Sequence, residues 1–137
     1  MEKNMGKIKE LSEICKNGVK LFSPLENRSI GPDPLQVDLC IEFIQKYLQP
    51  AKKLHRRSSY GWKHVVERWA ETYITNGAFI MAALLEGIDQ DIIYKSTHTR
   101  LFLSPKTRAI STMIKKGGSH DTDFKRKNVK SQLSQII

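Results

Sequence analysis

The spacing of apolar and polar positions along the chain predicts a series of amphipathic helices. Apolar side chains recur every three or four positions between residues 35 and 48, and again between residues 62 and 73. This spacing gives each segment one apolar stripe that a core can bury. The expected stripe of the second segment consists of Trp62, Val65, Val66, Trp69, Ala70 and Tyr73.

Residues that favour helix ends place the limits of these segments. Asp33 and Pro34 begin the first helix, because an aspartate accepts hydrogen bonds from free backbone N–H groups and a proline is tolerated in the first turn. Pro50 ends that helix. Ser59 is the expected cap of the second helix, and Asn76 is the expected cap of a short apolar helix that follows.

Two more helices complete the expected set. Residues 5–17 carry an apolar stripe that a glycine ends, formed by Ile8, Leu11, Ile14 and Cys15. Ser104 and Pro105 repeat the pattern of a cap followed by a proline, and the helix that they begin runs to about Lys116. Prolines and other turn-forming residues predict an irregular but ordered loop over residues 23–34.

The segment after the short apolar helix supports two interpretations. Two apolar runs around a polar turn favour a small β-hairpin near residues 91–103. The alternative is a helix-turn-helix, in which Gly87 forms the turn and residues 88–98 form a recognition helix. Glu86 and Ser96 stand where that motif needs apolar residues, so the hairpin is the preferred interpretation.

Together these elements predict a mainly α fold, a compact bundle of about five helices with a small β-hairpin. We expect a single mainly helical domain over residues 1–116 and a flexible basic C-terminal tail over residues 117–137, because two glycines and a polar run follow the last helix. With the hairpin in place, a winged-helix arrangement is an alternative, its helical pair formed by residues 62–73 and 77–86.

The cysteines and the apolar runs indicate the compartment. Cys15 and Cys40 lie in apolar patterns without metal-type spacing, which favours reduced thiols and a cytoplasmic location. The N-terminal residues lack the continuous apolar run of a secretion signal. Since no apolar run reaches the roughly 20 residues that span a bilayer, we expect no membrane partner.

Positive charge is concentrated in two parts of the sequence. The chain has 23 lysines and arginines against 14 acidic residues, a formal charge of +9. Residues 51–70 hold six positive residues and one negative, and residues 101–116 hold four positive residues and no acidic one. Such blocks favour phosphate-rich or acidic partners.

The first block interleaves cations with aromatic residues, which suits phosphate contacts beside a stacking surface. Tyr60 is the expected stacking residue, whereas Trp62 belongs to the apolar stripe and is expected in the core. The predicted nucleic-acid-binding residues are Lys52, Lys53, Arg56, Arg57, Tyr60, Lys63, Lys106, Arg108, Lys115 and Lys116.

No pattern in the sequence predicts catalysis. The four histidines are widely separated and match no zinc spacing, and no nucleophile elbow or phosphate-binding glycine loop is present. We therefore expect no catalytic residues, no metal site, no cofactor and no enzymatic activity.

The expected function is that of a non-enzymatic nucleic-acid-binding accessory or regulatory protein, with DNA favoured over RNA. The alternative is a protein-binding adaptor or inhibitor that docks its basic face on an acidic partner protein. The many aromatic residues of the segment 62–73 also suit a homodimer.

Overall fold

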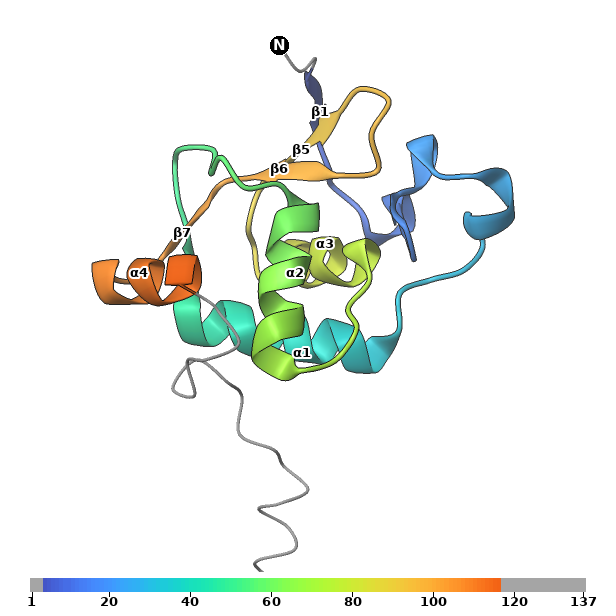
Figure 1. Cartoon of the computed structure of the whole chain (residues 1–137). Coiled ribbons are helices and arrows are strands. Elements are labelled where there is room, and N and C mark those ends of the chain that lie inside the picture. Colours follow the sequence, from blue (N-terminus) through green and yellow to red (C-terminus); the bar gives the residue numbers. More distant parts are fainter. Residues whose placement is uncertain (1–3, 117–137) are drawn as a thin grey trace, which may run out of the picture.

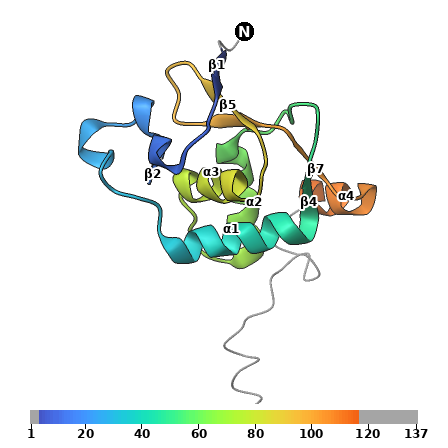
Figure 2. The same cartoon turned by 180° about the vertical axis from the view of Figure 1, so that it is seen from behind.

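Three helices surround the largest apolar side chains, and a fourth helix lies at the edge of the molecule (Figure 1). The structure, a computed structural model, describes residues 4–116. Its helices are α1 (Pro34–Tyr47), α2 (Ser59–Ala70), α3 (Asn76–Leu85) and α4 (Arg108–Lys116). Figure 2 shows α1 and α3 running across the molecule, with α2 behind them, and all three pack against one another.

The main core forms where the apolar stripes of these helices meet. Trp62, Val65, Val66 and Trp69 of α2 are buried, as predicted, and so are Phe43, Ile44 and Tyr47 of α1. The ring centroids of Phe43 and Trp69 lie 5.3 Å apart in an edge-to-face contact. Tyr73 departs from the predicted stripe, because α2 ends at Ala70 and leaves its side chain 62% exposed.

Short strands form three small sheets beside the helices. The predicted hairpin is confirmed: β5 (Gln90–Ile93) pairs antiparallel with β6 (Thr99–Leu101). The strand β1 (Asn4–Lys7) joins the far edge of β5, so the sheet has the order β1-β5-β6. Two smaller antiparallel pairs are formed by β2 (Ile14–Cys15) with β3 (Gly18–Val19) and by β4 (Leu48–Pro50) with β7 (Leu103–Pro105).

The predicted fold class, a mainly α bundle of about five helices, is wrong. Residues 4–116 form four α-helices and seven strands, a mixed α/β arrangement. The main error is the helix expected over residues 5–17. The Glu13 carboxylate accepts hydrogen bonds from the backbone N–H groups of Lys9 and Glu10 and closes a tight turn there, while Ile8 and Ile14 bury themselves in a second small core beside α3. Tertiary packing thus overrides a local helical pattern.

Two other expectations change in detail. Strand β5 occupies the place of the recognition helix, so the helix-turn-helix alternative is wrong. Helices α2 and α3 each begin one residue early, with Ser58 and Thr75 as caps that accept hydrogen bonds from Gly61 and Ala78. The winged-helix alternative stays a prediction, as does the division into one domain and a tail, since residues 117–137 lie outside the described residues.

The capping prediction for α1 is confirmed, because the Asp33 carboxylate accepts a hydrogen bond from the backbone N–H of Leu35 and Pro34 is the first residue of the helix. Cys15 and Cys40 are buried free thiols, and burial raises the pKa of the Cys40 thiol. None of the helices within residues 4–116 combines the length and the apolar character that a membrane span requires.

Candidate functional site

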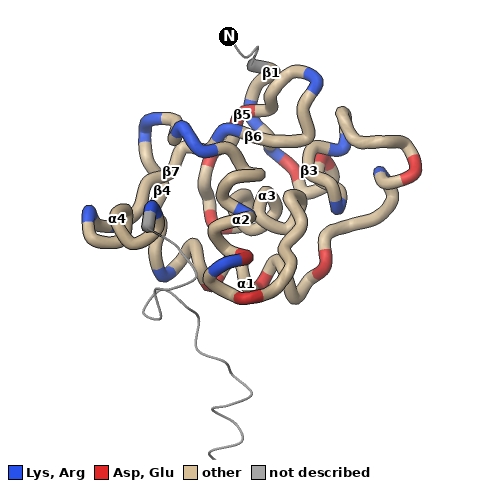
Figure 3. Tube along the Cα trace, in the orientation of Figure 1, with Lys and Arg blue, Asp and Glu red and all other residues tan. Residues whose placement is uncertain are grey.

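The fold brings the two basic blocks of the sequence together. Strand β4 leads into the first block and pairs with β7, which leads into α4 and the second block. Two backbone hydrogen bonds then hold the loop over residues 51–58 against the segment that joins β6 to β7. The N–H of Ala51 donates to the carbonyl oxygen of Phe102, and the N–H of His55 donates to that of Leu101. Figure 3 shows the lysines and arginines of this loop and of α4 on the same side of the molecule.

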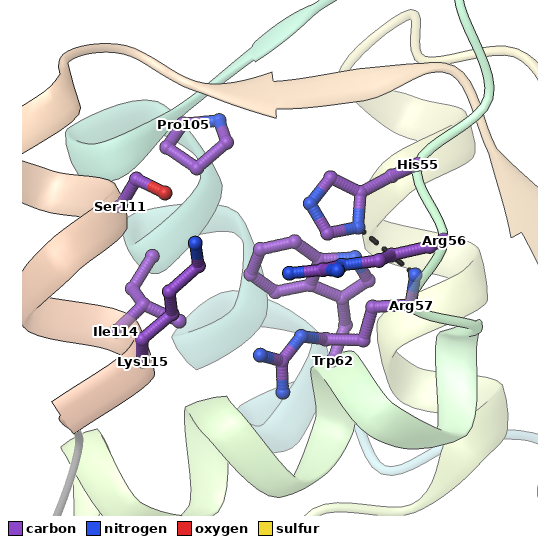
Figure 4. A pocket seen from close by; sticks show the side chains of 8 residues that line it. All are labelled: His55, Arg56, Arg57, Trp62, Pro105, Ser111, Ile114 and Lys115. Atoms are coloured by element: carbon purple, nitrogen blue, oxygen red, sulfur yellow. Dashed lines mark hydrogen bonds between the residues drawn. The ribbon is translucent and has the colours of Figure 1, made fainter.

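A pocket of about 200 Å³ lies between the loop and α4. We call it the basic pocket (Figure 4), and its described lining consists of His55, Arg56, Arg57, Trp62, Pro105, Ser111, Ile114 and Lys115. Three cationic side chains from two distant parts of the sequence line this space. None of the described residues that line it is acidic, so no carboxylate within the lining offsets their charge.

The position of Arg57 depends on two neighbours. Its guanidinium carbon lies 5.1 Å from the ring centre of Trp62, a cation–π distance. Its aliphatic chain crosses the first turn of α2 at Gly61, where a Cβ atom would come within 2.6 Å of the Arg57 Cγ. Glycine at this position therefore gives the arginine its path over the helix.

His55 is held in one protonation state. Its Nδ1 accepts a hydrogen bond of 3.0 Å from the backbone N–H of Arg57. Burial lowers the pKa of His55 below its ordinary value of 6.5, and the charges of Arg57, Arg56 and Lys115 lower it further. The imidazole is thus neutral at pH 7, with the proton on Nε2. The three cations also line the same pocket as His55.

Two buried donors of this pocket lack hydrogen-bond acceptors among the described residues. They are Nε of Arg57 and Nε1 of Trp62, whose side chain is 1% exposed. Burial also lowers the pKa of Arg57, with Arg68 and Arg56 adding to the effect. A buried N–H group without an acceptor costs about 1–3 kcal/mol. An anion in the pocket would relieve the mutual repulsion of the cations that line it.

The other predicted contacts of the two blocks lie outside this pocket. Lys52 and Lys53 are exposed on the loop, and Arg108 is exposed at the start of α4. The Lys106 ammonium donates a hydrogen bond to the carbonyl oxygen of Gln45. Lys116 ends α4, and its side chain lies outside the described part of the chain.

Tyr60 and Lys63 line a second pocket, which helical spacing places on the face of α2 away from Trp62. We call it the tyrosine–histidine pocket, with a volume of about 470 Å³. Its described lining consists of Lys16, Asn17, Tyr60, Lys63, His64, Glu67, Tyr73, Thr75, Asn76, Thr97 and His98. The predicted site is therefore divided between two pockets that share no lining residue among those described.

The charge of Lys63 is compensated within this second pocket. Its ammonium donates a hydrogen bond of 2.8 Å to Oε1 of Glu67, and the residue is only 5% exposed. The same ammonium lies 5.1 Å from the ring centre of Tyr60 and 4.9 Å from that of Tyr73. The sequence pattern predicts this lysine–glutamate pair, because the two residues are four positions apart on a helix.

Aromatic contacts give the pocket its shape. The His98 ring stacks on the Tyr60 ring with centroids 4.8 Å apart and an interplanar angle of 19°. The His64 ring meets Tyr60 edge-on at 4.5 Å, and its Nδ1 lies 3.2 Å from Oε1 of Glu67. Burial, and then the charge of Lys63, lowers the pKa of His98, so this ring is uncharged at neutral pH.

A buried polar network supports the wall of the second pocket. The Asn76 amide donates to the carbonyl oxygens of Asn17 and Thr97, both at 2.9 Å, and accepts a hydrogen bond of 2.8 Å from the Ser59 hydroxyl. Ser59 in turn accepts from the backbone N–H of Thr99. These bonds join α2, α3, the β2–β3 turn and the β5–β6 loop.

Sequence reasoning missed several of the lining residues. His64 and Glu67 fall on the same face of α2 as Tyr60, at i+4 and i+7, so helical spacing could have found them. His98 and Ser111 come from other elements, and no local pattern identifies them. Their positions follow from the pairing of β5 with β6 and of β4 with β7.

Within residues 4–116 no group of three or more histidine, cysteine or acidic side chains is arranged to hold a metal ion. Cationic side chains line one pocket, and aromatic side chains line much of the other. Comparisons of the chain with protein-family models, with curated proteins and with solved structures give no match.

Proposed function

We propose that this chain is a nucleic-acid-binding accessory protein of the cytoplasm that holds the phosphate backbone at its basic pocket. DNA is favoured over RNA as the ligand. Arg56, Arg57 and Lys115 are the proposed phosphate contacts, and the exposed Lys52 and Lys53 extend the positive surface. The proposed activity is binding without catalysis.

The convergence of Arg56, Arg57 and Lys115 around one pocket with no acid in its described lining carries this proposal. Phosphate is the anion that suits such a site, because guanidinium groups bind phosphate oxygens in a bidentate manner and a lysine adds a point charge. Each neutralised phosphate also releases condensed counterions, which favours binding to a polyanion.

The size of the pocket limits what enters it. Pockets for drug-sized ligands range from about 300 to 1,000 Å³. At about 200 Å³ the basic pocket is smaller than these, which suits a single phosphate group of a longer strand. The Ser111 hydroxyl supplies an uncharged donor within the same lining.

Gel retardation over a range of salt concentrations tests the proposal. The chain should retard DNA at about 50 mM salt, and the affinity should fall steeply by about 200 mM because counterion release drives binding. Absence of retardation at low salt with single-stranded DNA, double-stranded DNA and RNA would overturn it.

Charge removal at the pocket sharpens that experiment. Arg56→Ala and Lys115→Ala should each make the negative slope of log K against log salt less steep by about 1, since each removes one phosphate contact. Lys9→Ala is the matched control, because Lys9 is an exposed lysine outside both pockets. An equal loss in the control would show that only the total charge matters.

The adaptor alternative uses the same basic surface toward an acidic protein. Copurification separates the two functions: recovery of nucleic acid that nuclease removes supports the proposal, whereas a stoichiometric protein partner that survives nuclease supports the alternative.

A further inference from the structure

We infer that the tyrosine–histidine pocket receives an unpaired nucleobase, so that the chain binds single-stranded nucleic acid with a phosphate in one pocket and a base in the other. This inference rests on the proposed function, because it assumes that the ligand of the basic pocket is a nucleic acid. It adds a second site of different chemistry and a preference for unpaired strands.

The charge balance of the second pocket disfavours a phosphate as its main ligand. The ammonium of Lys63 is already hydrogen-bonded to Glu67 and lies against two tyrosine rings. A phosphate would have to approach the Glu67 carboxylate and compete with it. An uncharged ligand meets no such repulsion.

The lining of the pocket suits a flat, polar ring. Tyr60, Tyr73 and His98 offer aromatic surface, and the volume of about 470 Å³ lies within the range of small-ligand pockets. Bases stack on such side chains whatever their identity, because every base has a π face. Asn17, Thr97 and the imidazole of His64 place hydrogen-bonding groups around that surface.

Tyr73 is the residue most available to an incoming base. It follows the end of α2, its side chain is 62% exposed, and its ring centre lies 4.9 Å from the Lys63 ammonium. Tyr60, in contrast, already contacts His98 face to face and His64 edge-on. The base would therefore stack on Tyr73, next to the Lys63 ammonium that contacts both tyrosine rings.

The two pockets are close enough for one strand to reach both. Arg57 and Trp62 belong to the basic pocket, while Tyr60 and Lys63 belong to the other, so both pockets include residues at or next to the first turns of α2. A helix with its side chains is about 10–12 Å across. A few nucleotides that cross α2 at its N-terminal turns would connect the two sites. A base that is paired inside a duplex could not enter the second pocket at the same time.

Binding of strands with and without bases tests the inference. The probes are a fluorescein-labelled oligothymidine of about 16 nucleotides, the upper size of a single small binding site, and an abasic strand with the same number of phosphates. Fluorescence anisotropy should show the thymidine strand bound about fivefold or more tightly than the abasic strand, since fivefold is the lower end of the range for stacking of one base.

Substitution of Tyr73 assigns the difference to the pocket. Tyr73→Ala should bring the affinity for oligothymidine down to that for the abasic strand and leave the abasic affinity unchanged, whereas Tyr73→Trp should retain the difference. Tyr94→Ala is the matched control, because Tyr94 is an exposed tyrosine outside both pockets.

The possible outcomes separate this inference from the proposed function. Equal binding of both strands by the wild-type chain overturns the base site and leaves phosphate binding intact. A difference that persists in Tyr73→Ala overturns the placement of the base in this pocket. Binding of neither strand, nor of duplex DNA or RNA, overturns the proposed function itself.

Discussion

A lysine lines each of the two pockets beside α2, but the charge of the two lysines is compensated differently. In the tyrosine–histidine pocket, Lys63 is buried against Glu67 and two aromatic rings. In the basic pocket, Lys115 faces two arginines and no acid among the described lining residues. The same residue type therefore stabilises the fold in one place and remains available for an external anion in the other.

The supports of the two pockets differ in the same sense. The wall of the tyrosine–histidine pocket is a buried network in which Asn76 satisfies three polar groups from three different segments. The basic pocket is formed by a loop, a strand end and the edge helix α4, and two of its buried donors lack acceptors among the described residues. The polar groups around the tyrosine–histidine pocket are thus paired within the fold, whereas two buried donors at the basic pocket are not paired with any described residue.

The largest effect is expected from breaking the polar network. Asn76→Ala leaves the Asn17 carbonyl oxygen and the Ser59 hydroxyl without this partner, whereas the Thr97 carbonyl oxygen keeps its hydrogen bond from the backbone N–H of Val19. Each lost hydrogen bond of this kind costs about 1–3 kcal/mol, so the free energy of unfolding should fall by about 2 kcal/mol or more. Urea denaturation followed by circular dichroism measures this. Asn27→Ala, at a partly exposed asparagine far from the network, is the control. A loss below about 1 kcal/mol would show that the network is not a support.

A matched pair of lysine substitutions tests the contrast in charge directly. Lys63→Met leaves Glu67 without its closest cation and should destabilise the fold by about 1–3 kcal/mol. Lys115→Met removes repulsion from its pocket and should leave stability unchanged or slightly higher while it weakens nucleic-acid binding. Thermal unfolding and anisotropy on both variants provide the comparison. If the two substitutions lower stability equally, the distinction between the pockets fails.

Gly61 separates binding from stability at the basic pocket. Alanine there places a Cβ atom within 2.6 Å of the Arg57 Cγ and forces the guanidinium off Trp62. Binding should weaken by about tenfold or more, since tenfold is the lower end of the range for the loss of one charged hydrogen bond. Stability should stay the same or rise by up to about 1 kcal/mol, because alanine favours the helix. Gly31→Ala is the control, since nothing lies within 4 Å of its added Cβ. Unchanged binding would show that Arg57 does not contact the strand.

The smallest effect concerns acid pH. The folded-state pKa values of His55 and His98 both lie below 6.5, so the unfolded chain takes up protons first as the pH falls. Stability that is constant above about pH 6.5 should therefore decline between about pH 6.5 and 5. Added salt should weaken this decline more at His55, which responds to three cations, than at His98, which responds to Lys63 alone. Urea denaturation of His55→Asn and His98→Asn at two salt concentrations distinguishes them, and a pH-independent stability would contradict the expectation.

The helices that the sequence predicts well are those whose pattern coincides with the final packing. Asp33, Pro34 and the apolar stripe of α1 all favour the same helix, and the hairpin formed by β5 and β6 follows from two apolar runs around a polar turn. Residues 5–17 show the limit of this reasoning. Their helical spacing is real, but Ile8 and Ile14 gain more burial in the small core beside α3 than a surface helix would give them.

The candidate site was predicted in its charges and not in its geometry. Arg56, Arg57 and Lys115 are identified by the sequence, yet their convergence depends on the pairing of β4 with β7, two strands of three residues that carry no alternating pattern. Tyr60 and Lys63 were assigned to the same surface. Their positions on α2 turn them to the opposite side, which only the packing of α2 against its neighbours determines.

The network around Asn76 also has a consequence for evolution. Gly77 lies so close to the carbonyl oxygen of Cys15 that a Cβ atom would stand 1.9 Å from it. A Cβ atom at Gly18 would also clash, with the carbonyl oxygen of Thr97. Replacing any one of these residues alone would break contacts made by the others. Distant relatives should therefore keep a common set of residues even where their apolar cores have diverged. This set consists of Ser59, Asn76, Gly77 and Gly18.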